Sequence, residues 1–157
     1  MCHFSPSLKF VAILSSGMSQ RPTTLERLRQ PVAGYGLPAR AGVALVTALL
    51  GNLAVLNVAI TAELAPDLMA LAYPPVAVLT TAGVVGGVVV FRVLESRSET
   101  PTRTFTRVAL GVLVLSFIPD IGIMLADDTA TAAGVGALAV MHLTTAVACI
   151  AFVPSGE

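Results

Sequence analysis

Two ionisable residues, Asp120 and His142, lie inside long apolar stretches of the sequence. A charged side chain in hydrocarbon costs about 2.5–3.5 kcal/mol on insertion scales, so an ionisable residue at such a position points to a function. Asp120 could bind a proton or a cation, because either one neutralises a carboxylate that has left water. Histidine titrates near neutral pH, and beside a carboxylate His142 would form a proton relay.

Both residues also have a structural interpretation. Asp120 could be neutral, or hydrogen-bonded to Asn57 and a threonine, which would join helices at about 0.6 kcal/mol per contact. His142 could be bonded to an asparagine or to a backbone carbonyl. The residue types alone favour this structural interpretation over a proton site.

The elements that must position these residues are four apolar stretches, each near the ~20 residues that a helix needs to cross the hydrocarbon. They cover residues 41–62, 74–93, 108–126 and 130–153. They lack the alternation of a barrel strand, and backbone polar groups in lipid must be paired within the segment, so helices are predicted. The composition agrees, with 55% hydrophobic residues, 11% charged residues and a mean hydropathy of +0.87. We therefore predict an all-α fold, an integral membrane four-helix bundle.

Basic and acidic residues are sorted along the chain. All nine Lys and Arg residues lie before the first stretch or around the link between the second and third. The other two links carry acidic residues instead: Glu63, Asp67, Asp127 and Asp128. The positive-inside rule then places the basic segments in the cytoplasm and the acidic links outside. This predicts a cytoplasmic N-terminal segment over 1–40, a transmembrane domain over 41–153, and a cytoplasmic C-terminus in the cell membrane.

Polar residues on other stretches lie at matching depths. Counted from the predicted outer ends, Asn57 is near the depth of Asp120, and Asn52 is near that of His142. Two threonines of the second stretch share the outer layer, Thr80 and Thr81. Depth does not show which residues face one another, since Asn52 and Asn57 are about 140° apart around a helix. A polar site drawing on all four stretches is compatible with these depths.

Small residues and one proline predict how the helices pack. Gly83 and Gly87 form a GxxxG pattern on the second stretch, which is typical of close helix contact. Pro119 leaves the carbonyl of Leu115 without its helical donor, which predicts a kink beside Asp120. A small-residue face packs within one chain or between chains, so a homo-oligomer or a membrane protein partner stays open.

The N-terminal segment carries weaker signals. Residues 23–26 (Thr-Thr-Leu-Glu) match a capping box, which predicts a short amphipathic helix over 23–30 on the inner leaflet. A basic tail that only fixes the topology is an equal alternative. Met18 resembles an alternative start, so residues 1–17 are expected to be disordered or untranslated.

Several classes of function are disfavoured by the sequence. A net charge of zero argues against a nucleic-acid partner. Cys2 and Cys149 form no CxxC pair, and with His3 they are too few to hold a structural zinc, so no metal or cofactor is predicted. Residues 134–139 fit the loose GxGxxA pattern by chance, since no strand precedes them. Capping of the fourth helix explains Asp127 better than a cation site does.

The chain resembles a family of small four-span prokaryotic membrane proteins, found in archaea and high-GC bacteria and known as a domain of unknown function. The resemblance covers residues 35–153 and is carried by residues 116–120 (Ser-Phe-Ile-Pro-Asp), by residues 141–143 (Met-His-Leu) and by asparagine in the first stretch. It implies a four-helix fold and no established activity, so it transfers no catalytic or binding residues.

The favoured interpretation is a non-enzymatic multi-pass membrane protein with a structural or accessory role in the bilayer. The alternative is a small proton- or cation-coupled transporter, in which Asp120 is the coupling carboxylate and His142 and Asn57 line the path. A membrane enzyme ranks third, because no nucleophile or metal set accompanies the polar residues. The lipid bilayer is the partner that the composition implies.

Overall fold

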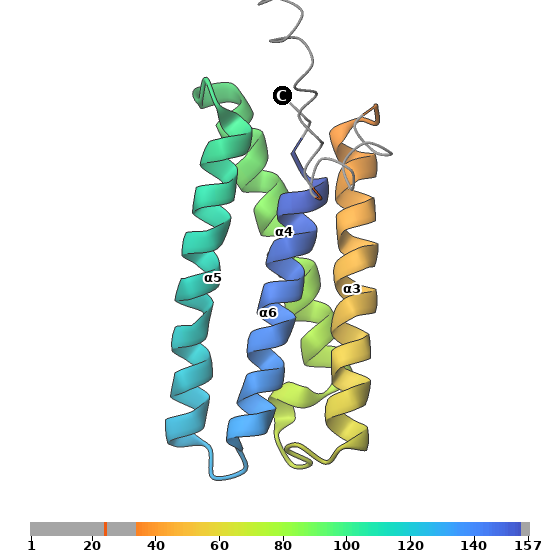
Figure 1. The fold of residues 1–157 in the computed structure, drawn as a ribbon, viewed down its shortest axis with the longest axis vertical. Coiled ribbons are helices and arrows are strands. Elements are labelled where there is room, and N and C mark those ends of the chain that lie inside the picture. The colour runs from red at the N-terminus through yellow and green to blue at the C-terminus, as the bar shows by residue number, and fades with distance from the viewer. Residues whose placement is uncertain (1–23, 25–33, 155–157) are drawn as a thin grey trace, which may run out of the picture.

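A computed structural model of the chain describes residues 34–154 together with Thr24. Its elements are α3 (Leu37–Thr61), the short 3-10 helix η1 (Met69–Leu71), α4 (Tyr73–Arg97), α5 (Pro101–Ala126) and α6 (Ala132–Phe152). The four long helices run alternately up and down as one bundle (Figure 1). The predicted all-α four-helix bundle is therefore confirmed. The predicted amphipathic helix 23–30 and the segment 1–17 lie outside the described residues, with the single exception of Thr24.

α3, α4 and α5 begin before the apolar stretches that the sequence marks, and α4 also ends beyond its stretch, whereas α6 lies within the predicted 130–153. α3, α4 and α5 each carry a proline in the first turn, where a missing N–H costs nothing because that donor has no helical acceptor. α6 begins after Thr131, whose hydroxyl accepts a hydrogen bond from the Gly134 amide at 3.0 Å. The largest difference is at the start of α5, which begins at Pro101 rather than at residue 108 and so adds polar turns before the apolar stretch.

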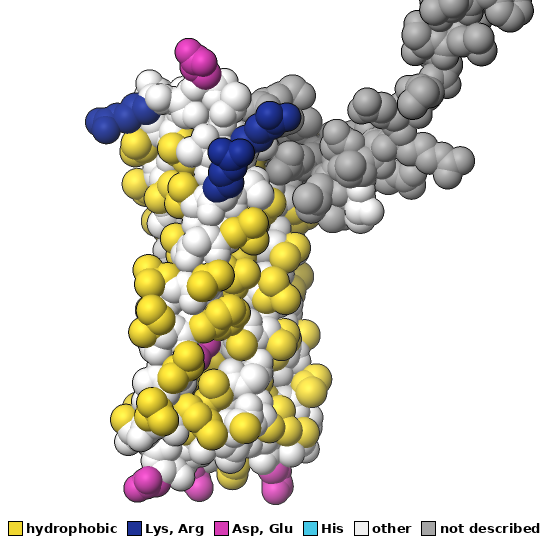
Figure 2. Space-filling view, turned by 60° about the vertical axis from the view of Figure 1, so that its left-hand side comes forward, with side chains coloured by type: hydrophobic (Ala, Val, Ile, Leu, Met, Phe, Trp, Pro, Cys, Tyr) yellow, Lys and Arg dark blue, Asp and Glu magenta, His cyan; other side chains and the backbone are white. Residues whose placement is uncertain are grey.

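Charge and hydropathy divide the bundle along its long axis. One end, here called the basic end, holds the α4–α5 link and five arginines: Arg40, Arg92, Arg97, Arg103 and Arg107. The other, the acidic end, holds the links after α3 and after α5, with Glu63, Asp67, Asp127 and Asp128. Hydrophobic side chains cover the surface between the two ends (Figure 2). All four helices are long and apolar enough to cross a membrane, so the chain is a multi-pass membrane protein.

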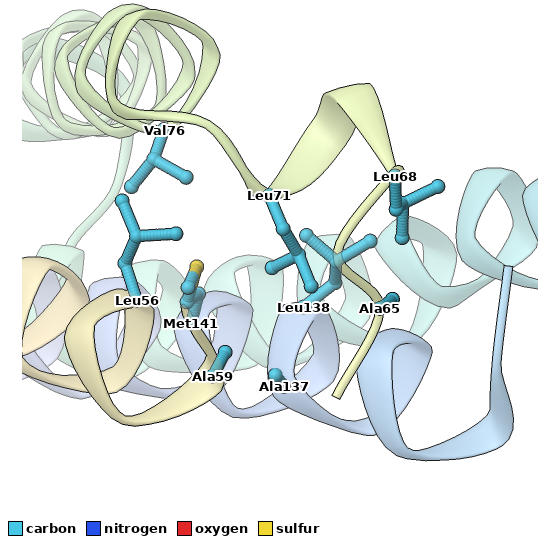
Figure 3. Packing of buried hydrophobic residues seen from close by; sticks show 9 residues of the cluster. All are labelled: Leu56, Ala59, Ala65, Leu68, Leu71, Val76, Ala137, Leu138 and Met141. Atoms are coloured by element: carbon cyan, nitrogen blue, oxygen red, sulfur yellow. The ribbon is translucent and has the colours of Figure 1, made fainter. Parts of the chain in front are cut away.

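Two apolar clusters hold the helices together. The cluster toward the acidic end joins α3, η1, α4 and α6 around Leu56, Leu71 and Met141 (Figure 3). The cluster toward the basic end contains Phe91 and Phe105, whose rings meet edge to face with centroids 5.3 Å apart. α5 takes little part in either cluster, because its buried residues are Thr102, Phe105 and Asp120.

Glycines let α6 approach its neighbours. A Cβ atom built on Gly51 of α3 would lie 2.5 Å from Cγ2 of Thr144, so this position requires glycine as the helices stand. A Cβ atom on Gly83 or Gly87 of α4 would lie 3.5 Å from Cγ2 of Thr145 or 3.4 Å from Sγ of Cys149, which is ordinary contact. The GxxxG residues therefore face α6, and among the glycines of α3 and α4 it is Gly51 whose added Cβ atom would meet α6 most closely.

Candidate functional site

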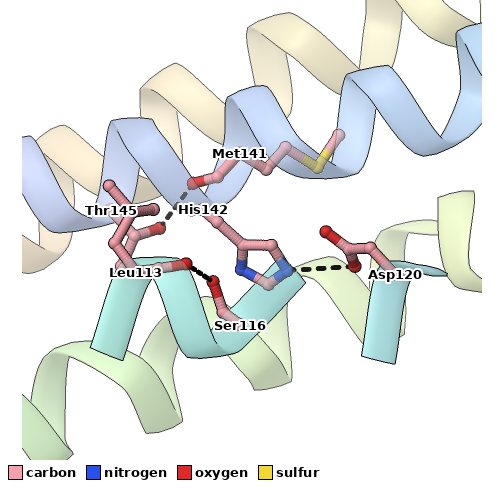
Figure 4. Close-up of polar contacts among 6 residues, drawn as sticks. All are labelled: Leu113, Ser116, Asp120, Met141, His142 and Thr145. Carbon is pink, nitrogen blue, oxygen red and sulfur yellow. Dashed lines mark hydrogen bonds and ion pairs between the residues drawn. The ribbon is translucent and has the colours of Figure 1, made fainter. Parts of the chain in front are cut away.

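Asp120 and His142 meet in the interior of the bundle. Nε2 of His142 on α6 lies 3.2 Å from Oδ1 of Asp120 on α5 (Figure 4). The Asp120 side chain is 7% exposed and the His142 side chain 35% exposed. His142 is the middle residue of α6, so the pair lies deep within the membrane-crossing part. The two ionisable residues that the sequence singles out thus form one pair.

Residue counting predicts that Asp120 and His142 lie at different depths in the membrane. The directions of their two helices explain why the side chains nevertheless meet. Side chains on an α-helix tilt toward its N-terminus. α5 runs toward the acidic end and α6 runs back from it, so Asp120 tilts toward the basic end and His142 tilts toward the acidic end. The tilts reduce the offset that residue counting suggests. Pro119 precedes Asp120 within α5, which the structure assigns as one helix through this proline.

A second polar contact lies next to the first and links three helices. Nδ2 of Asn52 on α3 donates to the hydroxyl oxygens of Thr80 on α4 at 2.8 Å and of Thr145 on α6 at 2.9 Å. Thr145 in turn donates to the carbonyl oxygen of Met141 at 3.0 Å (Figure 4). Sequence analysis did not single out Thr145, although its spacing of three residues from His142 places both on one helix face.

Two buried acceptors in these contacts receive no hydrogen bond from the described residues. They are Oδ2 of Asp120 and Oδ1 of Asn52. The residues are 5% and 2% exposed, so both oxygens are removed from solvent. A buried polar atom without a partner costs about 1–3 kcal/mol, and more when it is charged. Both positions are therefore suited to a group that donates a hydrogen bond.

The remaining predicted site residues lie elsewhere. Asn57 is exposed, donates to the carbonyl oxygen of Leu53 at 2.7 Å, and accepts from the Tyr73 hydroxyl at 3.0 Å. Thr81 donates to the carbonyl oxygen of Ala77 within α4 at 2.8 Å. Asp120 is thus paired with His142, and neither Asn57 nor Thr81 joins that contact.

A cavity of about 640 Å³ lies between α4, α5 and α6 and reaches Asn52 on α3. Its walls are mainly apolar, and its polar lining residues are Asn52, Thr80, Ser116, Asp120, His142 and Thr145. The volume falls in the range of about 300–1,000 Å³ that is typical of small-molecule sites. Both polar contacts and both unpaired acceptor residues therefore border one space.

Ser116 in the cavity and Asp127 at the acidic end have local hydrogen-bond partners. The hydroxyl of Ser116 donates to the carbonyl oxygen of Leu113 at 2.7 Å (Figure 4). In the link before α6, Asp127 accepts hydrogen bonds from the Thr129 hydroxyl at 2.6 Å and from the Thr129 amide at 2.9 Å. These bonds, the hydroxyl first, lower the pKa of Asp127. The helix cap is Thr131, and the described residues contain no cluster of His, Cys, Asp and Glu that could hold a metal.

Fold and site together define a four-span membrane protein with a polar pair beside an intramembrane cavity. Residues 26–156 match the model of a family of unknown function, DUF6069, and the chain belongs to that family. The match confirms the expected family of unknown function. No curated protein and no solved structure matches the chain.

Proposed function

We propose that this protein is a small proton-coupled carrier in which the Asp120–His142 pair binds the proton beside the cavity. The observation that carries the proposal is the buried contact between the two side chains, with Oδ2 of Asp120 left without a donor. An ionised carboxylate in that state is costly in hydrocarbon, and a bound proton or cation removes the cost. A purely structural contact has no need of an unsatisfied acceptor.

The packing of α5 supports the proposal that this helix moves relative to the other three. Thr102 and Phe105 bury this helix near the basic end, and farther along it only Asp120 is buried. A helix with few buried contacts separates from its neighbours at the lowest cost. Movement of α5 about the Phe105 contact would change the access of Asp120 while its basic end stays packed on Phe91.

A structural or accessory role remains the second candidate, and the Asn52 contacts favour it. One side-chain amide bridges two threonines on different helices, which is how polar side chains join transmembrane helices. The two roles are compatible, because Asn52 can hold α3, α4 and α6 together while α5 moves. We further propose that the protein is not an enzyme, since the Ser116 hydroxyl donates to a backbone carbonyl and is not held by His142.

We also propose that the basic end faces the cytoplasm. The described residues begin and end at this end, beside the α4–α5 link (Figure 1). The positive-inside rule favours this placement for its five arginines. Both termini would then be cytoplasmic, and both acidic links would lie outside.

The test uses the full-length chain in liposomes that contain a pH-sensitive dye at acidic internal pH. Three amphipathic solutes are added outside one at a time: benzyltrimethylammonium as a cation, benzyl alcohol as a neutral solute and benzenesulfonate as an anion. A carrier that couples its solute to protons changes the internal pH when its own class of solute is added. We expect wild-type vesicles to respond to at least one class.

Substitutions test whether the change in internal pH depends on Asp120 and His142. Asp120→Asn is expected to remove the pH response, whereas Asp128→Asn, the same change at an exposed link residue, is expected to keep it. His142→Gln keeps a hydrogen-bond donor but carries no proton, so it is expected to move solute without a pH change. Circular dichroism and gel filtration verify that each variant is folded. Equal pH responses in wild type and folded Asp120→Asn, for all three classes, would overturn the proposal.

A further inference from the structure

We infer that the cavity takes a hydrophobic organic cation with N–H donors, such as a primary ammonium, which replaces the proton as the counter-ion of Asp120. This inference names the substrate class of the proposed carrier and therefore rests on the proposed function. It starts from the two unpaired acceptors, Oδ2 of Asp120 and Oδ1 of Asn52. Both belong to residues that line the same cavity. The lining residues contain these two free acceptors and no arginine or lysine, which favours a ligand that supplies donors.

Asp120 and Asn52 contact α6 at positions one helical turn apart. Their partners on α6, His142 and Thr145, are three residues apart, which is a rise of about 4.5 Å along the helix. An ammonium group carries three donors and can bond to more than one acceptor around it. We therefore place the charged head of the ligand beside His142 and Thr145, between the side chains of Asp120 and Asn52.

The charge of the cavity selects a cation. Asp120, His142 and Cys149 are the titratable side chains among its lining residues, and the lining of α3 and α4 contributes none. With His142 neutral, the carboxylate of Asp120 is the one charge on the wall. A cation then gains a partner in a medium of low dielectric constant, whereas an anion would be repelled.

The remaining walls select an apolar body. Leu79, Val108, Val112, Leu138 and Phe105 line the cavity together with several small residues. Such walls match an apolar body, and they offer no polar partners to replace the water shell of a small hydrated ion. The ligand class is therefore a small amphipathic cation rather than a hydrated ion.

The cavity opens toward the bilayer between α4 and α5. Leu79 of α4 and Val112 of α5 both line it, and they are 65% and 57% exposed. Figure 2 shows acidic surface at a gap within the hydrophobic band, between apolar side chains. A molecule that is dissolved in the bilayer can enter here without crossing either charged end.

Binding and protonation are linked by charge balance. In the empty site, a proton on Nε2 of His142 neutralises the Asp120 carboxylate. When the ammonium enters, its charge takes over this role, and the proton of His142 leaves to the aqueous phase once α5 has moved and changed the access of the site. One positive charge enters and one leaves, so the net charge of the site is unchanged. This is the exchange that a proton-coupled carrier requires.

The test measures binding by calorimetry to the full-length chain in detergent micelles. The probes are benzylammonium, benzyltrimethylammonium, benzyl alcohol and benzoate, which share one ring and differ in charge and donors. We expect benzylammonium to bind most tightly, benzyltrimethylammonium next, and the neutral and anionic probes at least ~10-fold more weakly, which is 1.4 kcal/mol. Asp120→Asn should weaken the binding of benzylammonium by at least about 10-fold. Titrations in two buffers of different ionisation enthalpy should show release of up to one proton.

Two further variants keep the inference falsifiable if Asp120→Asn does not fold. Asn52→Ala should weaken the binding of benzylammonium several-fold. Asn57→Ala, on the same helix but away from the cavity, should leave the binding unchanged. His142→Gln should retain binding and lose proton release. Equal binding of benzyl alcohol or benzoate, or equal effects of the two asparagine variants, would overturn the inference. Proton-coupled transport of a neutral or anionic solute that depends on Asp120 would refute the cation while leaving the carrier proposal intact.

Discussion

Asn52 of α3 and Thr145 of α6 are joined by a hydrogen bond of 2.9 Å, and the same Asn52 amide also donates to Thr80 of α4. This residue is therefore the polar junction of three helices. Loss of both bonds in Asn52→Ala should lower the free energy of unfolding by about 1 kcal/mol, at ~0.6 kcal/mol for each bond in a membrane. Unfolding of the micellar protein by added SDS, followed by circular dichroism, measures this change.

Asn57→Ala is the matched control for that prediction. Asn57 is exposed and keeps one inter-residue side-chain contact outside its own helix, with the Tyr73 hydroxyl. Asn57→Ala should therefore lower the free energy of unfolding by less than Asn52→Ala does. An equal or larger cost for Asn57→Ala would show that the interior junction contributes nothing special to stability.

Gly51 of α3 lies directly against the Thr144 side chain of α6, which predicts a strong effect of one added methyl group. Gly51→Ala would place its Cβ atom 2.5 Å from Cγ2 of Thr144. Overpacking of this kind costs about 1–3 kcal/mol. Gly42→Ala on the same helix meets nothing within 4 Å and should be neutral or stabilising, because alanine favours the helix.

A double substitution separates this clash from other effects of alanine. Thr144→Ser removes the Cγ2 methyl group while keeping the hydroxyl that donates to the carbonyl oxygen of Val140. Gly51→Ala should therefore cost clearly less in the Thr144→Ser background, as measured by the same SDS unfolding. The same cost in both backgrounds would mean that Thr144 is not what the new methyl group meets.

The proposed orientation predicts which link is reached from outside the cell. In a chain with Cys2→Ser and Cys149→Ser, a single cysteine is introduced by Ser98→Cys at the basic end or by Asp128→Cys at the acidic end. A membrane-impermeant maleimide added to intact cells should label the Asp128→Cys protein only. Lysed cells give both proteins equal access and serve as the control. Labelling of the Ser98→Cys protein in intact cells would reverse the topology.

The sequence was sufficient to predict the bundle, because hydropathy and backbone pairing in lipid leave helices as the answer for four such stretches. It also indicated the residues of the central pair. It did not reveal their pairing: residue counting placed Asp120 and His142 in different layers, whereas side-chain tilt on antiparallel helices brings them together. The rotation of each helix about its own axis could not be predicted from the sequence either. This rotation makes Asn52 buried and Asn57 exposed.

The cavity was beyond sequence reasoning for a related reason. Its volume depends on how loosely α5 packs, and an apolar helix that faces lipid has the same composition as one that faces protein. The family match adds no activity, since the family itself is of unknown function. The central claim therefore rests on the geometry of Asp120 and His142.

The most direct measurement of that claim is nitrogen-15 NMR of the His142 ring. The chain has two histidines, so His3→Gln leaves His142 as the single labelled histidine. We predict that the Nε2 resonance carries the signature of a hydrogen bond to the Asp120 carboxylate, and that Asp120→Asn shifts this resonance. Ring resonances that are the same with Asp120 and with Asp120→Asn would contradict the account.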